Sequence, residues 1–90
     1  MPTVDVIDRG EVIKVVTDLR GAKKENIRLA IRGRTLIISV GGTGRRYRRR
    51  VELTATMDPI HSTSTFKNGV LEVTLKKSNQ AVEGPDIRVE

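Results

Sequence analysis

The sequence predicts an all-β fold, an immunoglobulin-like two-sheet antiparallel β-sandwich of about seven strands. Apolar and polar residues alternate in short runs along the 90 residues, as they do in strands with one buried face. Turn-forming residues separate these runs at regular spacing, which is typical of sandwiches. No segment keeps an apolar period of about 3.6 residues, and the best helix candidate, residues 22–26, is barely one turn.

The first half of the chain supplies four of the expected strands, at residues 3–8, 12–19, 27–32 and 35–40. Tight turns at Arg9-Gly10 and Gly33-Arg34 connect them in pairs. Every other residue of the second strand is expected to point inward, and these are Ile13, Val15, Thr17 and Leu19. In the fourth strand Leu36, Ile38 and Val40 point inward, and Ile37 is left outside.

The second half supplies three more strands. One is expected at residues 46–53 and one at 61–67, and the last follows the dipeptide Asn68-Gly69, the strongest short hairpin signal. In that last strand Leu71, Val73 and Leu75 share one face. The apolar pattern stops at residue 78. We therefore expect one sandwich domain, residues 1–77, followed by a flexible C-terminal extension, residues 78–90.

Composition limits what kind of protein this is. Ninety residues make one small domain, which buries roughly 60 to 65% of the surface that its unfolded chain exposes. Without cysteine there is no disulfide framework or thiolate metal site. No apolar run approaches the ~20 residues of a membrane span, and no signal peptide is recognisable. We expect a cytoplasmic protein that does not bind membranes.

Catalytic, cofactor-binding and metal-binding residues are not expected. His61 is the single histidine, so neither a Cys-His pair nor a His-rich metal site can form. Gly41-Gly42-Thr43-Gly44 follows a strand but lacks the lysine and the helix of a phosphate-binding loop. The carboxylates are scattered along exposed positions. The sequence therefore indicates a protein that is not an enzyme and has no cofactor.

Residues 51–77 resemble, without gaps, the α-crystallin domain of small heat shock proteins. Gly69, Val70 and Leu71 begin a run similar to the closing strand of that domain. Upstream, the sequence DLRG at residues 18–21 is similar to the family's Asp-Leu-Pro-Gly turn, with Arg20 in place of proline. Ile87-Arg88-Val89 resembles the family's C-terminal Ile-X-Ile/Val motif. The match is to a short, archaeal or bacterial form without a long N-terminal arm, since only Met1 and Pro2 precede the first strand.

The resemblance implies an ATP-independent chaperone, a holdase of the stress response that binds unfolded or partly unfolded client proteins and prevents their aggregation. It also implies homo-oligomers joined by the tail. Ile87 and Val89 are spaced i, i+2, so both side chains point the same way in an extended tail while Arg88 faces water. They are expected to fill a groove on another copy, formed by Leu29 and Ile31 of one strand and Thr63 and Thr65 of another.

The strand at residues 46–53 is the second expected subunit contact. Its Tyr47 and Arg49 share one face, and Arg49 falls where the family has an inward-leaning arginine. Gly41 to Gly44 is too short to lend a strand to a partner. Pairing of this edge strand with its own copy would set Arg45 to Arg50 against a second arginine run, which is unfavourable. We expect a monomer or a weak, salt-promoted dimer.

Two alternative functions remain open. The net charge of +6 is concentrated in Arg45, Arg46, Arg48, Arg49 and Arg50, which could grip nucleic-acid phosphates. Alternation divides these arginines between two faces, however, and Tyr47 is the one aromatic nearby, which disfavours nucleic acid as a partner. The other alternative is a co-chaperone-like adaptor sandwich, against which the terminal Ile-X-Val motif argues.

Overall fold

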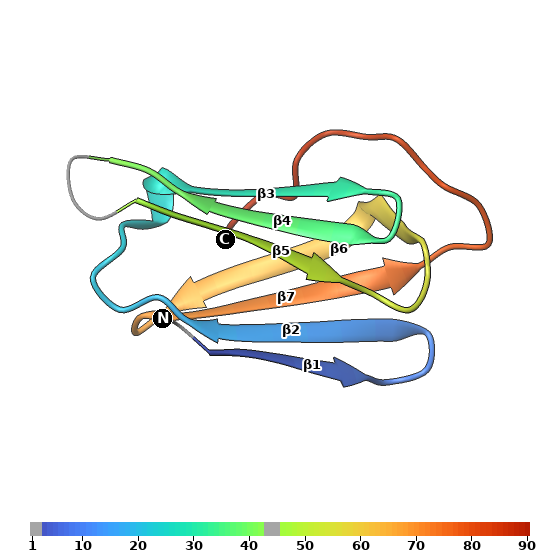
Figure 1. Ribbon diagram of the computed structural model, residues 1–90, viewed down its shortest axis with the longest axis horizontal. Coiled ribbons are helices and arrows are strands. Elements are labelled where there is room, and N and C mark those ends of the chain that lie inside the picture. Colours follow the sequence, from blue (N-terminus) through green and yellow to red (C-terminus); the bar gives the residue numbers. More distant parts are fainter. Residues whose placement is uncertain (1–2, 43–45) are drawn as a thin grey trace.

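The computed structural model describes residues 3–42 and 46–90 as a sandwich of two antiparallel sheets (Figure 1). The four-stranded sheet has the order β1-β2-β7-β6, and the three-stranded sheet has the order β3-β4-β5. The strands are Val4–Asp8 (β1), Val12–Asp18 (β2), Ile27–Arg32 (β3), Thr35–Val40 (β4), Tyr47–Glu52 (β5), Met57–Lys67 (β6) and Val70–Lys77 (β7). The all-β class and the seven strands are confirmed. No helix of the described residues is long and apolar enough to cross a membrane.

The core lies between the two sheets and consists of aliphatic side chains. The four residues predicted to point inward from the second strand are all buried: Ile13, Val15, Thr17 and Leu19. From β4 and β7 the inward residues are likewise buried, namely Leu36, Ile38, Val40, Leu71, Val73 and Leu75. Tyr47 and Phe66 pack only against the margin of this cluster. Alternation alone therefore predicts most of the core.

The β6–β7 hairpin turns at the predicted dipeptide. Asn68 and Gly69 have φ values of 52° and 79°, as a two-residue turn between twisted strands requires, and Lys67 pairs with Val70. A Cβ atom at Gly69 would lie 2.5 Å from Cγ of Arg20. The backbone N–H of Leu19 also donates a hydrogen bond to the carbonyl oxygen of Gly69, at 2.8 Å. The two short motifs that carry the family resemblance thus contact each other.

Two elements differ from the sequence prediction. The expected helical turn at residues 22–26 is a single 3-10 turn, η1, at Lys24–Asn26. The strand β6 begins at Met57 rather than at residue 61, and its pairing with β7 shifts register between Asp58 and Thr63. Pro59 lies in this irregular stretch, where a residue without an N–H group costs no ladder hydrogen bond. Met57 is fully buried and belongs to the core.

The Asp58 carboxylate organises that irregular stretch. Its Oδ1 accepts a hydrogen bond from the backbone N–H of Ile60 at 2.9 Å, and its Oδ2 lies 2.6 Å from Nδ1 of His61. The hydrogen bond with His61 is the largest cause of the lowered pKa of Asp58. A Cβ atom at Gly84 would lie 3.1 Å from side-chain atoms of Pro59 and Ile60. The segment that leads from β7 to the C-terminus therefore passes close to the irregular stretch of β6.

Candidate tail groove and subunit-contact strand

The edges of β3 and β6 hold the C-terminal residues of the same chain (Figure 1). The backbone N–H of Ile87 donates to the carbonyl oxygen of Leu29 at 2.9 Å. On the other side, the N–H of Glu90 donates to the carbonyl of Ser64, and the N–H of Phe66 donates to the carbonyl of Glu90, each at 3.0 Å. Because β3 and β6 are edge strands of different sheets, residues 87–90 satisfy open backbone groups of both sheets at once.

Side chains of the tail alternate between buried and exposed positions. Ile87 is only 4% exposed and is part of the core cluster, Val89 is partly buried against that cluster, and Arg88 faces outward. On the β3 side Leu29 is fully buried and Ile31 is 6% exposed. The two strands named from the sequence are therefore those that hold the tail, although here the tail and the groove belong to one chain.

The side chain of β6 that meets the tail is Ser64, which the sequence analysis missed. Ser64 is 1% exposed, and its hydroxyl donates a hydrogen bond to the carbonyl oxygen of Arg88 at 2.8 Å. Thr63 is exposed and Thr65 is half-buried, and both lie on the opposite face of the strand. The structure thus brings the strand of Thr63 and Thr65 to the tail but turns both threonine side chains away from it, because a shift of one residue reverses the direction of a side chain.

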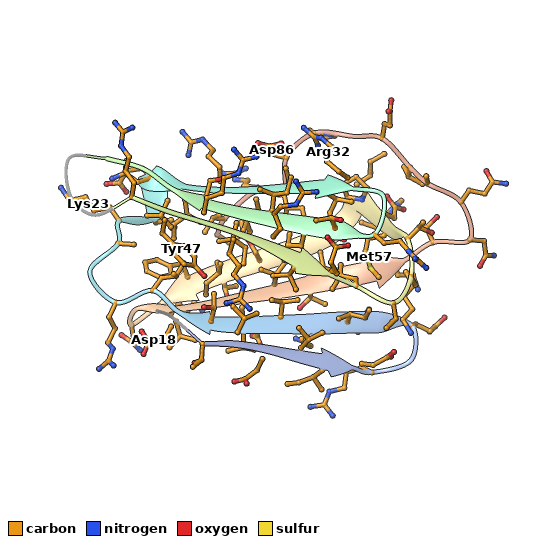
Figure 2. The ribbon with its side chains drawn as sticks, in the orientation of Figure 1. Asp18, Lys23, Arg32, Tyr47, Met57 and Asp86 are labelled. Carbon is orange, nitrogen blue, oxygen red and sulfur yellow. The ribbon has the colours of Figure 1, made fainter. Side chains whose placement is uncertain are left out.

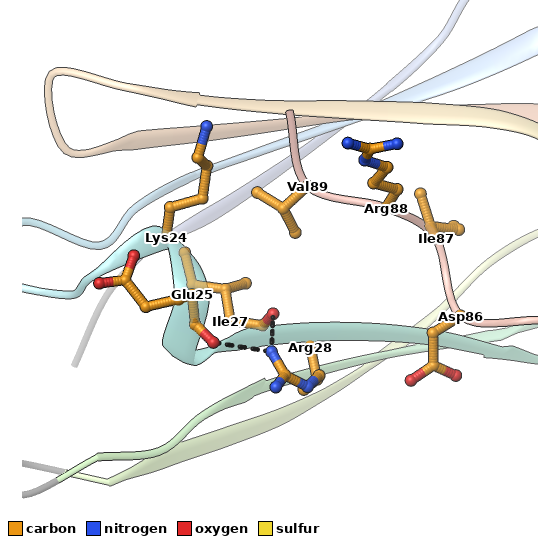
Figure 3. Close-up of a pocket in the computed structure, with 8 residues that line it drawn as sticks. All are labelled: Lys24, Glu25, Ile27, Arg28, Asp86, Ile87, Arg88 and Val89. Carbon is orange, nitrogen blue, oxygen red and sulfur yellow. Dashed lines mark hydrogen bonds between the residues drawn. The ribbon is translucent and has the colours of Figure 1, made fainter.

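Open space remains beside the docked tail. A pocket of about 370 Å³ lies between the tail and the start of β3 (Figure 3). Charged and apolar side chains from both segments line it, and these are Lys24, Glu25, Ile27, Arg28, Asp86, Ile87, Arg88 and Val89. Figure 3 also shows the Arg28 guanidinium donating to the carbonyl oxygens of Glu25 and Ile27, at 2.8 and 3.1 Å. The tail therefore leaves part of the groove accessible at this end.

The expected subunit-contact strand is β5, at one edge of the three-stranded sheet. Tyr47 packs against the core (Figure 2). Arg49 pairs with the fully buried Ile38, so it lies on the inward face of β5, and it is half-buried. The connection from β4 occupies residues 41–46, of which Thr43, Gly44 and Arg45 lie outside the described residues. Since Val40 pairs directly with Tyr47, this connection joins two neighbouring strands of one sheet.

Replacing Tyr47 by phenylalanine is expected to raise the free energy of unfolding by about 1 kcal/mol. The Tyr47 hydroxyl is buried and has no hydrogen-bond partner among the described residues, so its desolvation is uncompensated. The melting temperature should rise by about 4 to 8 °C for a domain of this size. Thermal unfolding followed by far-UV circular dichroism measures this. A lower melting temperature for the phenylalanine variant would contradict the reading and indicate a partner for the hydroxyl.

The sequence of this chain is similar to those of known small heat shock proteins. The profile of the Hsp20/alpha crystallin family matches residues 5–90. The small heat shock protein, chloroplastic, of Oxybasis rubra is 33% identical over 82 residues, which is 81% of this chain and 40% of that protein. The chain therefore spans about two-fifths of the length of this curated relative.

Solved structures share the fold. Heat shock protein 16.0 from Schizosaccharomyces pombe superimposes with a TM-score of 0.75 at 24% identity, covering 99% of this chain and 97% of that one. A Del-C4 mutant of hsp14.1 from Sulfolobus solfatataricus P2 gives a TM-score of 0.75 at 23% identity, covering 91% and 78%. At such identities the likeness is one of fold. The family profile, matched over nearly the whole chain, decides the assignment: this chain belongs to the Hsp20/alpha crystallin family.

Proposed function

We propose that this chain is an ATP-independent molecular chaperone, a holdase of the small heat shock protein type. Family membership supports this proposal. The observation that carries it is the groove between β3 and β6, which receives an extended segment through backbone hydrogen bonds and buries an apolar side chain. Backbone hydrogen bonds do not depend on the identity of the side chains. Any extended chain with apolar residues at i and i+2 can therefore make the same contacts. Unfolding proteins expose such segments.

Further edges are available for the same kind of contact. The strand β1 lies at the outer edge of the four-stranded sheet, and its Val6 and Ile7 are 48% and 37% exposed. An edge strand with exposed apolar side chains is a template for strand addition. Binding of this kind needs no nucleotide, cofactor or catalytic residue. The cytoplasm stays our predicted compartment.

Self-association is proposed to use the same groove. The tail that occupies its own groove can dock equally on a neighbouring copy, because the contacts of Ile87, Val89 and Ser64 would be unchanged. Burying two aliphatic side chains contributes roughly 2 to 5 kcal/mol before ordering costs, and ordering the extension removes much of this. Single contacts between copies are therefore weak and matter when several act together.

Weak suppression of client aggregation is the expected activity. Light scattering of a heat-denatured client should fall when the chain is present in equal amounts, because client segments compete for the groove. Replacing Ser64 by alanine removes the hydroxyl that donates to the Arg88 carbonyl oxygen. The tail should then leave the groove more easily, and suppression of client aggregation should increase because clients compete with the tail for the groove. Thr63→Ala, on the opposite face of β6, is the matched control and should leave suppression as it is.

Two outcomes would count against this proposal. The absence of any suppression at a tenfold excess of the chain would remove the holdase function. Equal effects of Ser64→Ala and Thr63→Ala would show that clients bind elsewhere than in the groove. Each variant is assayed at the same number of degrees below its own melting temperature, so that a change in stability is not mistaken for a change in binding.

A further inference from the structure

The outer face of the three-stranded sheet gathers arginines that are distant in sequence. The strand register aligns Arg28, Ser39 and Arg48 in one row, and Ala30, Ile37 and Arg50 in the next. A third row consists of Arg32, Thr35 and Glu52. All four arginines are exposed, and Figure 2 places the Arg32 side chain on the outside of the sandwich. Strand alternation removes Arg49 from this face, but folding adds the two arginines of β3.

Two more exposed arginines adjoin these rows along the chain. Arg34 lies in the turn between β3 and β4, and Arg46 directly precedes β5. We call these six residues the arginine face: Arg28, Arg32, Arg34, Arg46, Arg48 and Arg50. Glu52 is the one acidic residue in the three rows, and its carboxylate oxygens accept hydrogen bonds from the Thr35 hydroxyl at 3.1 Å. Within the three rows the face is therefore almost uniformly positive, and the acidic Glu25 and Asp86 line the pocket that Arg28 also lines, at one end of the face.

No arginine of the arginine face forms an ion pair with a residue that the structure describes. Among the described residues, the ion pairs of arginine and lysine involve other positions, namely Lys14, Arg20, Lys76, Lys77 and Arg88. The Arg32 guanidinium donates one hydrogen bond, at 2.9 Å, to the carbonyl oxygen of Ile31, and Arg28 likewise donates to carbonyls. Both side chains are exposed, and each guanidinium has further N–H donors that can bind an anion.

The chemistry of the arginine face fits phosphodiesters. Every cation on it is arginine, whose planar fork binds phosphate oxygens in pairs, whereas lysine offers a point charge. Arginines two residues apart on one strand lie about 6.7 Å apart, and those on β3 and β5 are separated by two strand spacings, about 9.5 Å. A lattice of this extent suits a chain of phosphates better than one small anion.

Two features favour a nucleic-acid duplex over single-stranded nucleic acid and over an anionic membrane. The two aromatic side chains lie elsewhere, since Tyr47 packs against the core and Phe66 belongs to β6, so unpaired bases find no stacking platform. The exposed large apolar side chains also lie elsewhere, on β1, β6 and β7, so this face has no anchor for a bilayer. We propose that the arginine face binds the phosphate backbone of double-stranded nucleic acid independently of its sequence.

The test is the salt dependence of binding to a fluorescently labelled 20-base-pair DNA duplex, measured by anisotropy. With four phosphates neutralised, the logarithm of the affinity should fall with a slope of about −3.6 against the logarithm of salt, roughly 150-fold between 50 and 200 mM. Arg48→Gln with Arg50→Gln should make this slope shallower by about 1.8. Arg28→Gln with Arg32→Gln, on the other edge of the same face, should do the same.

A matched control removes two positive charges elsewhere. Arg9 and Lys67 are exposed and lie in the β1–β2 turn and on β6, so changing both to glutamine should leave the slope unaltered. Equal loss in the control, or no duplex binding at 50 mM salt, overturns the proposal. Binding of phosphatidylserine vesicles without binding of the duplex overturns it in favour of a lipid surface. Client light scattering should be unaffected by Arg48→Gln with Arg50→Gln, which separates this site from the proposed chaperone groove.

Discussion

Replacing Leu71 by alanine is expected to lower the free energy of unfolding by about 2 to 5 kcal/mol. Leu71 is fully buried on β7, a strand that lies between β2 and β6 and pairs with both. Its removal leaves a cavity under the hairpin, where the neighbouring aliphatic side chains of both sheets converge. A small domain has only about 5 to 15 kcal/mol of stability in total. The loss should therefore be evident as a much earlier urea or thermal unfolding transition.

The adjacent residue provides the control for this substitution. Val70 precedes Leu71 on the same strand but points outward and is 41% exposed. Val70→Ala removes two carbon atoms, against three for Leu71→Ala, but opens no cavity, and it should cost less than about 1 kcal/mol. Equal destabilisation by the two changes would mean that the alternation assigned to β7 is not what determines its stability.

Changing Ile87 and Val89 together to glycine is expected to reduce the mass of assemblies toward that of the monomer. Both side chains that occupy the groove are lost, so the tail keeps only its backbone hydrogen bonds and the Ser64 contact. The lost burial corresponds to roughly 2 to 5 kcal/mol before ordering costs, which is equivalent to a loss of affinity of about 1.5 to 3.5 orders of magnitude. Multi-angle light scattering at several protein concentrations measures the mass.

The segment of residues 78–86, which links β7 to the docked tail, offers a control with the same number of added glycines. Ala81 and Glu83 are exposed, and changing both to glycine leaves the groove contacts intact. Thermal unfolding of dilute protein adds a second readout: if the tail stays in its own groove, the Ile87 and Val89 double variant melts earlier even as a monomer. An unaltered mass at high concentration together with an unaltered melting temperature would show that the tail does not dock in this chain.

Local signals in the sequence were sufficient for the fold. Asn68-Gly69 sets the register of β6 and β7, and alternation then places Leu71, Val73 and Leu75 in the core. The same register also contains the information that was missed. Counting back from the turn puts Ser64 opposite Val73, and therefore on the inward face with the tail, whereas Thr63 and Thr65 face away. Pro59 obscured the start of β6, because proline argues against a strand unless the strand is irregular there.

Features that depend on pairing between distant segments could not be predicted from local patterns. The Gly33-Arg34 turn indicates that β3 pairs with β4, but Arg28 and Arg48 share one face only because β5 also pairs with β4, and no local pattern indicates that second pairing. Local patterns also could not predict whether the tail docks in the groove of its own chain or of another copy. The spacing of Ile87 and Val89 predicts an extended, one-sided tail, but the choice between a neighbour and its own chain depends on the path of residues 78–86.

The return of the tail to its own groove makes this subunit comparable to a monomer in ring–chain polymerisation. Tail and groove are different patches, so contacts between copies are heterologous and propagate into rings or open chains. Closure within one chain consumes both reactive ends and ends growth. A short linker such as residues 78–86 supplies an effective concentration on the order of millimolar for closure. Assemblies therefore grow only when the protein concentration exceeds this effective concentration, or when a second contact holds the subunits together.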